Sequence, residues 1–513
     1  MHLSLLMRGI DPLRTAGQPE GEVASVCYDS RLCGEGSLFV AIPGLKTDGH
    51  AFIGDAIRRG ARFIVHEGEY HPPAGVTAIR VSDSRRSLGI LGKNLFGNPS
   101  AGICLIAVVG TNGKTTVTYL LESILRAAGH SVGVLGTVNY RYSGRTLPAP
   151  NTTPESFEMQ RVLRQMADAG VTHVVAEVSS HAIDLKRVDD CAFDLGVFTN
   201  LTQDHLDYHK TMENYFQAKR RFFAEVLPAG GKNRRYRMVI NTDDPWGRRI
   251  VAELGGDPAG RLTYGIEPPC DVIARPFRLS LGGIEATLRF GSEGLAVTSP
   301  LMGRFNLLNI LAAAAAAFSL RIPGRSIRDG IAALINVPGR LERVSTAGQP
   351  AVFVDYAHTD DALRRVLENL TAFRTGRIIT VFGCGGDRDR GKRPLMGEAA
   401  ATLSDLAIVT SDNPRTEDPL AIIGEVVGGI PTTRFARAAD WLDRGGERGY
   451  LVVPDRGEAI AAAIGLAGSS DIVLIAGKGH EDYQIIGTRT FPFDDREVAR
   501  RELARSSPER DRT

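Results

Sequence analysis

Residues 110–116, GTNGKTT, combine the small, polar and basic residues that a phosphate-binding loop needs. They follow an apolar run at 103–109 and precede a segment with helical periodicity, so their backbone N–H groups can surround phosphate at a helix start. Lys114 would contact the β- and γ-phosphates of ATP, and the Thr115 hydroxyl would bind Mg²⁺. Val108 stands where the strict consensus has glycine, so the loop is a variant of this motif. The residues expected to bind ATP here are Gly110, Thr111, Asn112, Gly113, Lys114, Thr115 and Thr116.

Three side chains further along the chain could take part in the same chemistry. Glu177 lies at the end of an apolar run, and a carboxylate there can hold a second Mg²⁺. His205 lies in DHLDYH, where a histidine is more often structural, and zinc is disfavoured because no thiol or third ligand stands at the usual spacing. Lys219 lies in YFQAKRRFF, and a lysine in a basic helix is usually solvated. The residues alone therefore indicate a Mg²⁺–nucleotide site and assign no role to Lys219.

An α/β fold must position these residues, because apolar runs of strand length alternate with segments of helical periodicity. Polar or Gly-rich clusters follow the apolar runs, and ligands bind at the carboxyl ends of strands in open α/β sheets. The sequence therefore predicts parallel sheets with functional loops along one edge. We expect helices at 114–128 and after the N-cap motif at 153–155, and strands at 23–28, 37–42, 62–66, 77–81, 103–109, 171–178, 195–200, 351–355, 377–382, 405–410, 450–453 and 471–476.

Length and composition predict a globular protein of about three domains. The chain has 513 residues, of which 43% are hydrophobic and 23% charged. The segment 335–343, INVPGRLER, is typical of a connector, with Pro338 and Gly339 at its centre. We place the domain boundaries at 1–100, 101–337 and 338–513.

Charge and cysteine content indicate a cytoplasmic protein without nucleic-acid or membrane partners. The formal net charge is +2, from 61 basic and 59 acidic residues. The six cysteines show no metal-type pairing, which favours reduced thiols. The N-terminus lacks the pattern of a signal peptide. The apolar run at 307–320 is Ala-rich and too short to span a bilayer, so it predicts a buried helix.

Motifs along nearly the whole chain resemble the Mur ligase family, and are most similar to its MurE type. This resemblance implies an ATP-dependent ligase of peptidoglycan precursor synthesis, and hence of cell-wall biogenesis, cell shape and cell division. Such an enzyme adds meso-diaminopimelate to UDP-MurNAc-L-Ala-D-Glu through an acyl phosphate and releases ADP and phosphate. The motifs are GTNGKTT (110–116), NTTP (151–154), EVSSHA (177–182), TNLTQDHLDYH (199–209), AKRRFF (218–223), GRFNLLN (303–309), PGRLERV (338–344), VDYAHT (354–359), GCGGDRDRGKRP (383–394), DNPRTEDP (412–419) and AGKGHEDYQ (476–484).

The resemblance also implies what each domain binds. The N-terminal α/β domain would bind UDP near Ser30, with the loop 45–47 close by. The central P-loop domain, with its parallel sheet, would bind ATP. The C-terminal Rossmann-like domain would bind the amino acid. Asn306, Arg340 and Asp355 would contact adenine, phosphate and ribose. The residues implied for the muramoyl-dipeptide part are Asn151, Thr152, Thr153, Ser179 and Arg187.

By the same resemblance Lys219 would carry a carbamate formed with CO₂, which turns a cation into a carboxylate. Two Mg²⁺ ions would then be held by Thr115, Glu177, His205 and the Lys219 carbamate, together with phosphate oxygens. The residues implied in catalysis are Lys114, Lys219, Glu177 and His205.

Arg415, in DNPR, offers a guanidinium fork for a carboxylate that lysine would not replace well. Within the family DNPR resembles the version specific for meso-diaminopimelate. The residues expected to bind this amino acid are Arg388, Asp412, Asn413, Pro414, Arg415, Gly477 and Glu481.

Three other functions are compatible with part of the pattern. Folylpolyglutamate synthetase is a related amide ligase, but the N-terminal domain and DNPR argue against it. A P-loop ATPase or kinase would release or transfer phosphate without an amino acid. A non-catalytic nucleotide-binding module is disfavoured by the lysine, acid and metal groups. We expect small-molecule substrates only and a monomeric protein.

Overall fold

The computed structural model describes residues 1–44, 47–230, 232, 237–255, 260–346, 348–431, 436–437 and 448–505. Residues 45 and 46 of the loop expected near UDP lie outside the described residues. The chain divides into two compact units, which are described separately. The first comprises Met1–Pro276, Ala286–Val297 and Leu308–Ala333, and the second comprises Phe277–Glu285, Thr298–Leu307 and Leu334–Thr513.

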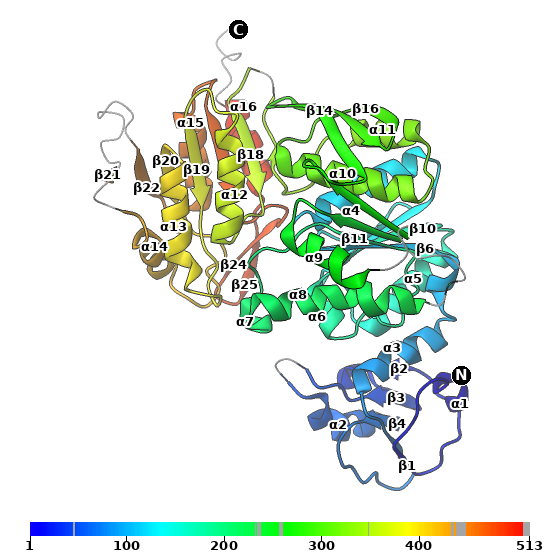
Figure 1. The fold of residues 1–513 in the computed structure, drawn as a ribbon. Coiled ribbons are helices and arrows are strands. Elements are labelled where there is room, and N and C mark those ends of the chain that lie inside the picture. The colour runs from blue at the N-terminus through cyan, green and yellow to red at the C-terminus, as the bar shows by residue number, and fades with distance from the viewer. Residues whose placement is uncertain are drawn as a thin grey trace. The chain divides into compact units, whose positions relative to one another are not determined.

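A five-stranded sheet organises the N-terminal part of the first unit (Figure 1, blue). Its order is β1 (Arg14–Ala16), β5 (Thr77–Arg80), β4 (Ala61–His66), β3 (Ser37–Val40) and β2 (Val26–Cys27), with only β1 antiparallel to its neighbour. The strand expected at 23–28 is thus confined to two residues. The helices are α1 (Leu3–Leu6), α2 (Ile53–Arg58) and α3 (Ser84–Leu95), with the short 3₁₀ turns η1 (Ser30–Leu32), η2 (Gly49–Phe52) and η3 (Pro99–Gly102).

The central sheet has eleven strands in the described structure, and its parallel part consists of β7, β10, β6, β11, β12, β13 and β14 in that order. Strand β6 is a continuous apolar run, and β10 is apolar apart from His173 and Glu177. All but the first residue of each strand are buried, as expected for parallel strands that are covered on both faces. The strands are β6 (Cys104–Val109), β7 (Val132–Leu135), β8 (Tyr140–Tyr142), β9 (Arg145–Leu147), β10 (His173–Val178), β11 (Leu195–Phe198), β12 (Arg237–Asn241), β13 (Arg261–Gly265), β14 (Val272–Ser280), β15 (Gly283–Phe290) and β16 (Glu293–Ser299).

The register of this sheet brings three functional loops to one edge. Val109 of β6 pairs with Val178 of β10 and with Phe198 of β11, so all three strands end at the same level. The segments that follow, starting at residues 110, 179 and 199, therefore leave the sheet together, as expected for ligand-binding loops.

Helices cover this sheet and supply part of its core. The apolar run at 307–320 lies within a helix whose residues Ala312 to Ala317 are fully buried, which confirms the expected buried helix. The described residues contain no helix long and apolar enough to cross a membrane. The helices are α4 (Lys114–Ala127), α5 (Ser156–Asp168), α6 (Ser180–Asp184), α7 (Leu206–His209), α8 (Met212–Arg221), continued by a π-helical turn at Phe222–Val226, the 3₁₀ turn η5 (Pro228–Gly230), α9 (Pro245–Leu254), α10 (Arg304–Ser319) and α11 (Gly324–Ala333).

The second unit has a seven-stranded sheet of order β17-β18-β23-β19-β20-β22-β21. Apart from β17, its strands are parallel, and helices pack on both of its faces (Figure 1). Its elements are β17 (Glu342–Arg343), β18 (Ala351–Asp355), α12 (Asp360–Thr371), β19 (Ile378–Phe382), α13 (Lys392–Leu403), β20 (Leu406–Val409), α14 (Pro419–Val427), β21 (Ala436–Arg437), β22 (Gly449–Val452), α15 (Arg456–Leu466), β23 (Ile472–Ala476) and α16 (Asp495–Arg505), with a separate hairpin of β24 (Tyr483–Ile486) and β25 (Arg489–Pro492).

Register again aligns the functional loops of this unit. Phe382 of β19 pairs with Val409 of β20, and Val381 pairs with Ile475 of β23. The segments 383–391, 410–418 and 477–482 therefore emerge at the carboxyl edge of the sheet. Every strand expected in this unit begins and ends within one residue of its expected position.

Candidate active site

The phosphate-binding loop connects β6 to α4, and its glycines allow the backbone path. Gly110 and Gly113 have positive φ of 151° and 86°, and Gly113 lies at the N-cap of α4. A Cβ on Gly113 would lie 2.3 Å from Asn309 Oδ1, so no side chain fits there. Asn112 N donates to Asn200 Oδ1 at 2.9 Å, and Thr111 N donates to Asn200 O at 2.9 Å. The segment after β11 thus holds the loop in shape.

Thr115 and Glu177 are brought together beside this loop. The Thr115 hydroxyl donates to Glu177 Oε2 at 3.1 Å, and Glu177 is almost fully buried. Thr137 donates to the same carboxylate twice, from its N–H at 3.0 Å and from its hydroxyl at 2.9 Å. These hydrogen bonds fix the Glu177 carboxylate at the end of β10, next to the start of α4.

Lys219 is buried rather than solvated, which contradicts the usual reading of a lysine in a basic helix. Its side chain in α8 has an exposed fraction of 1%, and its ammonium lies 4.5 Å from the Tyr215 ring centroid. Lys219 Nζ donates to Gly110 O at 2.9 Å, and Lys114 Nζ donates to the same oxygen at 2.9 Å. Burial, and secondly repulsion by Lys114, hold the pKa of Lys219 well below its usual value, with Asp204 opposing.

His205 lies at the start of α7 with a positive φ of 53°. Loss of hydration lowers its pKa to about 4; Asp204 opposes this shift, while His181, Lys114 and Lys219 reinforce it. The imidazole is therefore neutral at physiological pH and can donate a lone pair to a metal. His181 lies close by, with its ring centroid 4.8 Å from that of His205.

The donors at this edge fit Mg²⁺ rather than a transition metal. Within the described ranges, no three His, Cys, Asp or Glu side chains cluster as metal ligands. The Glu177 carboxylate and the Thr115 hydroxyl are hard oxygen donors, and Mg²⁺ binds few protein groups and keeps water and phosphate oxygens. The Lys219 ammonium is itself a cation and is not a ligand for Mg²⁺.

Four of the residues implied for the muramoyl-dipeptide surround the end of β10. Thr153 Oγ1 donates to Glu177 O at 2.9 Å and accepts from Ser179 N at 3.1 Å. Arg187 Nη1 donates to Thr153 O at 3.2 Å, and Thr152 Oγ1 lies 3.1 Å from Thr137 Oγ1. Asn151 is exposed just before this group, and Ser30 lies in η1 beside the N-terminal sheet.

Asn306, Arg340 and Asp355 belong to the second unit and are described within it. Asn306 is buried and its Nδ2 donates to Met302 O at 2.8 Å. Asp355 accepts from Leu341 N at 2.6 Å and from Ala357 N at 2.8 Å, which fixes the connector. Burial raises the pKa of Asp355, and Arg340 opposes this shift.

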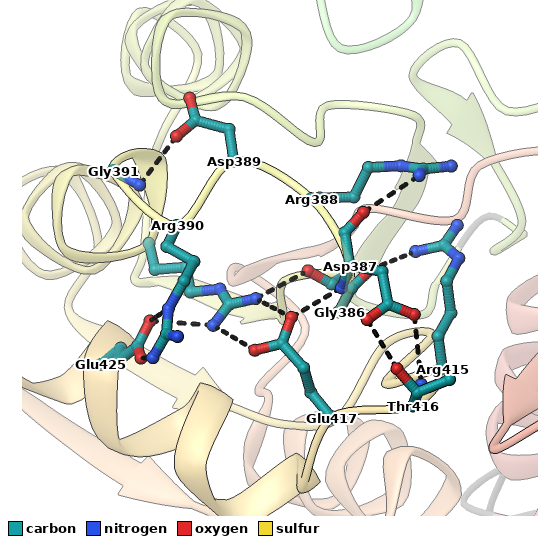
Figure 2. A network of polar contacts seen from close by, with 12 residues as sticks. Gly386, Asp387, Arg388, Asp389, Arg390, Gly391, Arg415, Thr416, Glu417 and Glu425 are labelled. Carbon is teal, nitrogen blue, oxygen red and sulfur yellow. Dashed lines mark hydrogen bonds and ion pairs between the residues drawn. The ribbon is translucent and has the colours of Figure 1, made fainter. Parts of the chain in front are cut away.

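The residues expected to bind diaminopimelate meet at the carboxyl edge of the second sheet. Asn413 Nδ2 donates to Glu481 Oε2 at 2.9 Å. Gly477 follows β23 and lies close to Asp412, because a Cβ added to Gly477 would be 3.4 Å from Asp412 Oδ2. The Arg388 and Arg415 guanidinium groups extend from two adjacent loops toward the same side (Figure 2). Arg415 follows Pro414 and has a positive φ of 51°.

The sequence motifs did not single out several residues that shape these sites. Thr137 is one, because it lies outside every motif and reaches Glu177 only through the sheet register. Lys478 is fully buried and donates to Asn413 Oδ1 at 3.0 Å. Arg393 is fully buried and paired with Glu417. Lys478 and Arg393 belong to quoted motifs, but only their burial distinguishes them from surface cations.

Three family models match consecutive parts of the chain. They are the Mur ligase family, catalytic domain (residues 22–94), the Mur ligase middle domain (108–317) and the Mur ligase, glutamate ligase domain (339–479). Together they confirm the expected three-domain α/β architecture.

Proteins of known function are similar to this chain over nearly its whole length. The UDP-N-acetylmuramoyl-L-alanyl-D-glutamate--2,6-diaminopimelate ligase of Geobacter metallireducens is 48% identical over 509 residues, 98% of this chain and 99% of its own. A solved structure of a ligase with that name is 33% identical, with a TM-score of 0.69, and the match covers 98% of this chain and 99% of that one. The MurF ligase of Thermotoga maritima in complex with ADP is 21% identical, with a TM-score of 0.61 and coverage of 94% and 98%, and shares the fold.

Proposed function

The chain belongs to the Mur ligase family, and on this premise we propose that it joins meso-diaminopimelate to UDP-MurNAc-L-Ala-D-Glu with conversion of ATP to ADP and phosphate. One observation carries the choice of amine: a full-length relative at 48% identity is named as a 2,6-diaminopimelate ligase. The DNPR motif of this chain supports the same choice. Three alternative functions, a phosphate-releasing ATPase, a kinase and a non-catalytic binding module, are disfavoured because the full-length relatives are named as ligases.

In the first half-reaction, the γ-carboxylate of D-Glu attacks the γ-phosphorus of ATP, and the bond to the β-phosphate oxygen breaks. Backbone N–H groups of residues 110–116 and the Lys114 ammonium would hold the phosphates in line. Thr115, Glu177 and His205 would hold Mg²⁺, which offsets the negative charge of the phosphates when bound. Thr153, Ser179 and Arg187 would orient the dipeptide. The chemistry then requires positioning and charge stabilisation, with no protein nucleophile.

We further propose that Lys219 acts as a carbamate. An amine must be neutral to attack CO₂, and the burial of Lys219 lowers its pKa in the required direction. The nitrogen forms a bond to the carbon of CO₂ and loses a proton, which leaves an N-carboxylate anion. This anion would lie beside Gly110 of the phosphate loop and close to Lys114, where a carboxylate can bind Mg²⁺ and pair with the Lys114 ammonium.

In the second half-reaction, the neutral amine of diaminopimelate attacks the acyl carbon. A tetrahedral intermediate forms, its nitrogen loses a proton, and the bond from carbon to the phosphate oxygen breaks, which releases phosphate and leaves the amide. Arg415 and Arg388 would bind the distal carboxylate of the amino acid, and Asp412 and Glu481 would bind its distal ammonium. This arrangement would hold the reacting amine at the opposite end of the molecule, toward the acyl phosphate.

The proposed substrates also suggest in which compartment the enzyme acts. Nucleotide-activated muramoyl peptides and ATP are cytoplasmic metabolites, so we propose a cytoplasmic enzyme that acts as a monomer on small molecules.

An amino-acid panel tests the proposed function. Phosphate release is measured with ATP, UDP-MurNAc-L-Ala-D-Glu and one amino acid at a time. We expect release to require both the nucleotide dipeptide and meso-diaminopimelate, and the product to gain one diaminopimelate residue by mass. Equal use of L-lysine, or release without any amino acid, would show that the proposed amine is wrong.

A further inference from the structure

A fully buried arginine joins the two loops that carry the amine-binding residues. Arg393, at the start of α13, has a side-chain exposed fraction of 0%. Its Nη1 donates to Glu417 Oε2 at 3.0 Å and to Glu425 Oε2 at 2.8 Å. Its Nη2 donates to Glu417 Oε1 at 2.8 Å and to Gly385 O at 3.3 Å. The guanidinium therefore binds Glu417 with two parallel hydrogen bonds and also holds the backbone of the loop after β19 (Figure 2).

Glu417 links the loop after β20 to the loop after β19. It belongs to the loop after β20, and its Oε1 accepts from Asp387 N at 2.6 Å in the loop after β19. Asp387 in turn accepts from the Thr416 hydroxyl at 2.7 Å. Gly386 N donates to Asn413 O at 2.9 Å, so the loop backbones also join directly. A Cβ on Gly386 would lie 1.9 Å from Pro414 O, which shows how closely the two loops approach.

The same loop segment fixes both arginines expected to bind the amino acid. Arg415 Nη1 donates to Gly386 O at 2.8 Å, and Arg388 Nη1 donates to Asp387 O at 3.1 Å. A Cβ on Gly385 would lie 2.9 Å from Arg415 Nη1 and 3.7 Å from Arg388 Cγ. The carbonyl that Arg393 holds therefore belongs to a residue that lies against both side chains.

We propose that Arg393 and Glu417 are positioning residues, which set the spacing of Arg388 and Arg415 and thereby the selection of the diamino acid. This inference rests on the proposed function for the identity of the amine. Lysine could not replace Arg393, because one ammonium cannot make two parallel hydrogen bonds to Glu417 and still reach both Glu425 and Gly385. Hydrogen bonds from Arg393 lower the pKa of Glu417 to about 2, so the pair stays charged in any assay buffer.

Glu425 provides a matched control for Glu417. Both carboxylates pair with Arg393, and their side chains have similar exposed fractions of 28% and 26%. Glu425 lies in α14 and also contacts Arg390, but within the described part of the chain its carboxylate accepts no hydrogen bond from the backbone of either loop. Loss of either acid weakens the charge pairing of Arg393, but only loss of Glu417 releases Asp387 N.

The test compares Arg393→Lys, Glu417→Ala and Glu425→Ala by steady-state kinetics and thermal unfolding. We expect Arg393→Lys and Glu417→Ala to raise KM for the diamino acid roughly tenfold to a hundredfold, because small misplacements of binding groups have effects of this size. The KM values for ATP and for the nucleotide dipeptide should stay unchanged. Glu425→Ala should change KM for the diamino acid by less than about twofold while lowering Tm as much as Glu417→Ala. Glu417→Gln, which keeps an acceptor for Asp387 N, should restore part of the lost affinity.

Two results would overturn the proposal. One is an unchanged KM for the diamino acid in Glu417→Ala, and the other is an equal rise in Glu425→Ala. If Arg393→Lys fails to fold, the two glutamate variants still decide. If the wild type uses another amine, the proposed function is wrong. The KM values of the variants are then measured with that amine, and they still decide whether Arg393 and Glu417 are positioning residues.

Discussion

At the residue scale, burial changes what Lys219 can do. An exposed lysine is almost entirely protonated near neutral pH and offers little neutral amine to CO₂, whereas Lys219 is buried beside Lys114 and its pKa is lowered. Its amine can therefore become neutral in the folded protein. A carbamate there would remove the repulsion between the two ammonium groups that share Gly110 O.

The first prediction concerns this residue. Lys219→Ala should lower the ligation rate by about a hundredfold or more, because a charge close to the transferring phosphate is lost. A short carboxylate such as acetate should restore part of the rate by occupying the vacated space. Lys210→Ala, at an exposed lysine just after α7, should change the rate little. Wild-type enzyme in labelled bicarbonate should show a carbamate NMR signal that Lys219→Ala lacks, and its absence from active wild type would contradict the proposal.

The second prediction concerns Asp190, whose side chain is buried with Oδ2 lacking a hydrogen-bond partner in the described structure. Burial raises its pKa from 3.8 to about 6, and Arg86 opposes this shift. The folded state therefore binds a proton that the unfolded state releases, so this stabilisation is present below pH 3.8 and is lost as the pH rises through about 6. Asp190→Asn should increase the free energy of unfolding by about 1 to 3 kcal/mol near pH 8 and by much less near pH 4.

Chemical denaturation at the two pH values measures this difference. Asp189→Asn is the matched control, because Asp189 accepts from Arg221 Nη1 at 3.2 Å and its replacement should destabilise the protein instead. An Asp190→Asn gain that does not depend on pH would rule out the titration of Asp190 as its cause.

At the element scale, strands and their loops were predictable, whereas contacts between elements were not. The unit β6, loop and α4 follows from an apolar run, two glycines and a helical pattern, and α4 begins at Lys114 as expected. The local sequence around Lys219 is basic and indicates exposure, but α8 packs its Lys219 face under the phosphate loop. The pairing of Arg393 with Glu417 joins residues 24 positions apart, and no local pattern encodes it.

The third prediction concerns the loop before α4. Gly113→Ala should weaken ADP binding by roughly tenfold or more, because a left-handed residue would carry a Cβ that clashes with Asn309 and the loop would move. Gly129→Ala is the control, since its φ of +84° matches the +86° of Gly113 and its Cβ would meet nothing within 4 Å. It should lower stability by about 1 kcal/mol and leave ADP affinity unchanged. Titration calorimetry measures both affinities, and an equal loss in both variants would refute the steric explanation.

At the scale of the whole molecule, two sheets repeat one design. Each aligns the ends of parallel strands and has polar or charged groups close to those ends. In the first unit these are the phosphate loop, Glu177 of β10 and Lys219 of α8, and in the second they are Arg388 and Arg415. The first set is suited to activating a carboxylate with ATP, and the second to holding a charged amino acid. The proposed acyl phosphate is the intermediate that links activation of the carboxylate to attack by the amino acid.

Transfer of oxygen from substrate to phosphate tests this link most directly. UDP-MurNAc-L-Ala-D-Glu labelled with ¹⁸O in its γ-carboxylate is incubated with ATP and meso-diaminopimelate, and the released phosphate is analysed by mass spectrometry. The carboxylate oxygen that attacks phosphorus leaves with the phosphate, so we predict one ¹⁸O atom in each phosphate and one in the new amide. Unlabelled phosphate would mean that water attacked ATP instead, and would contradict the acyl-phosphate account.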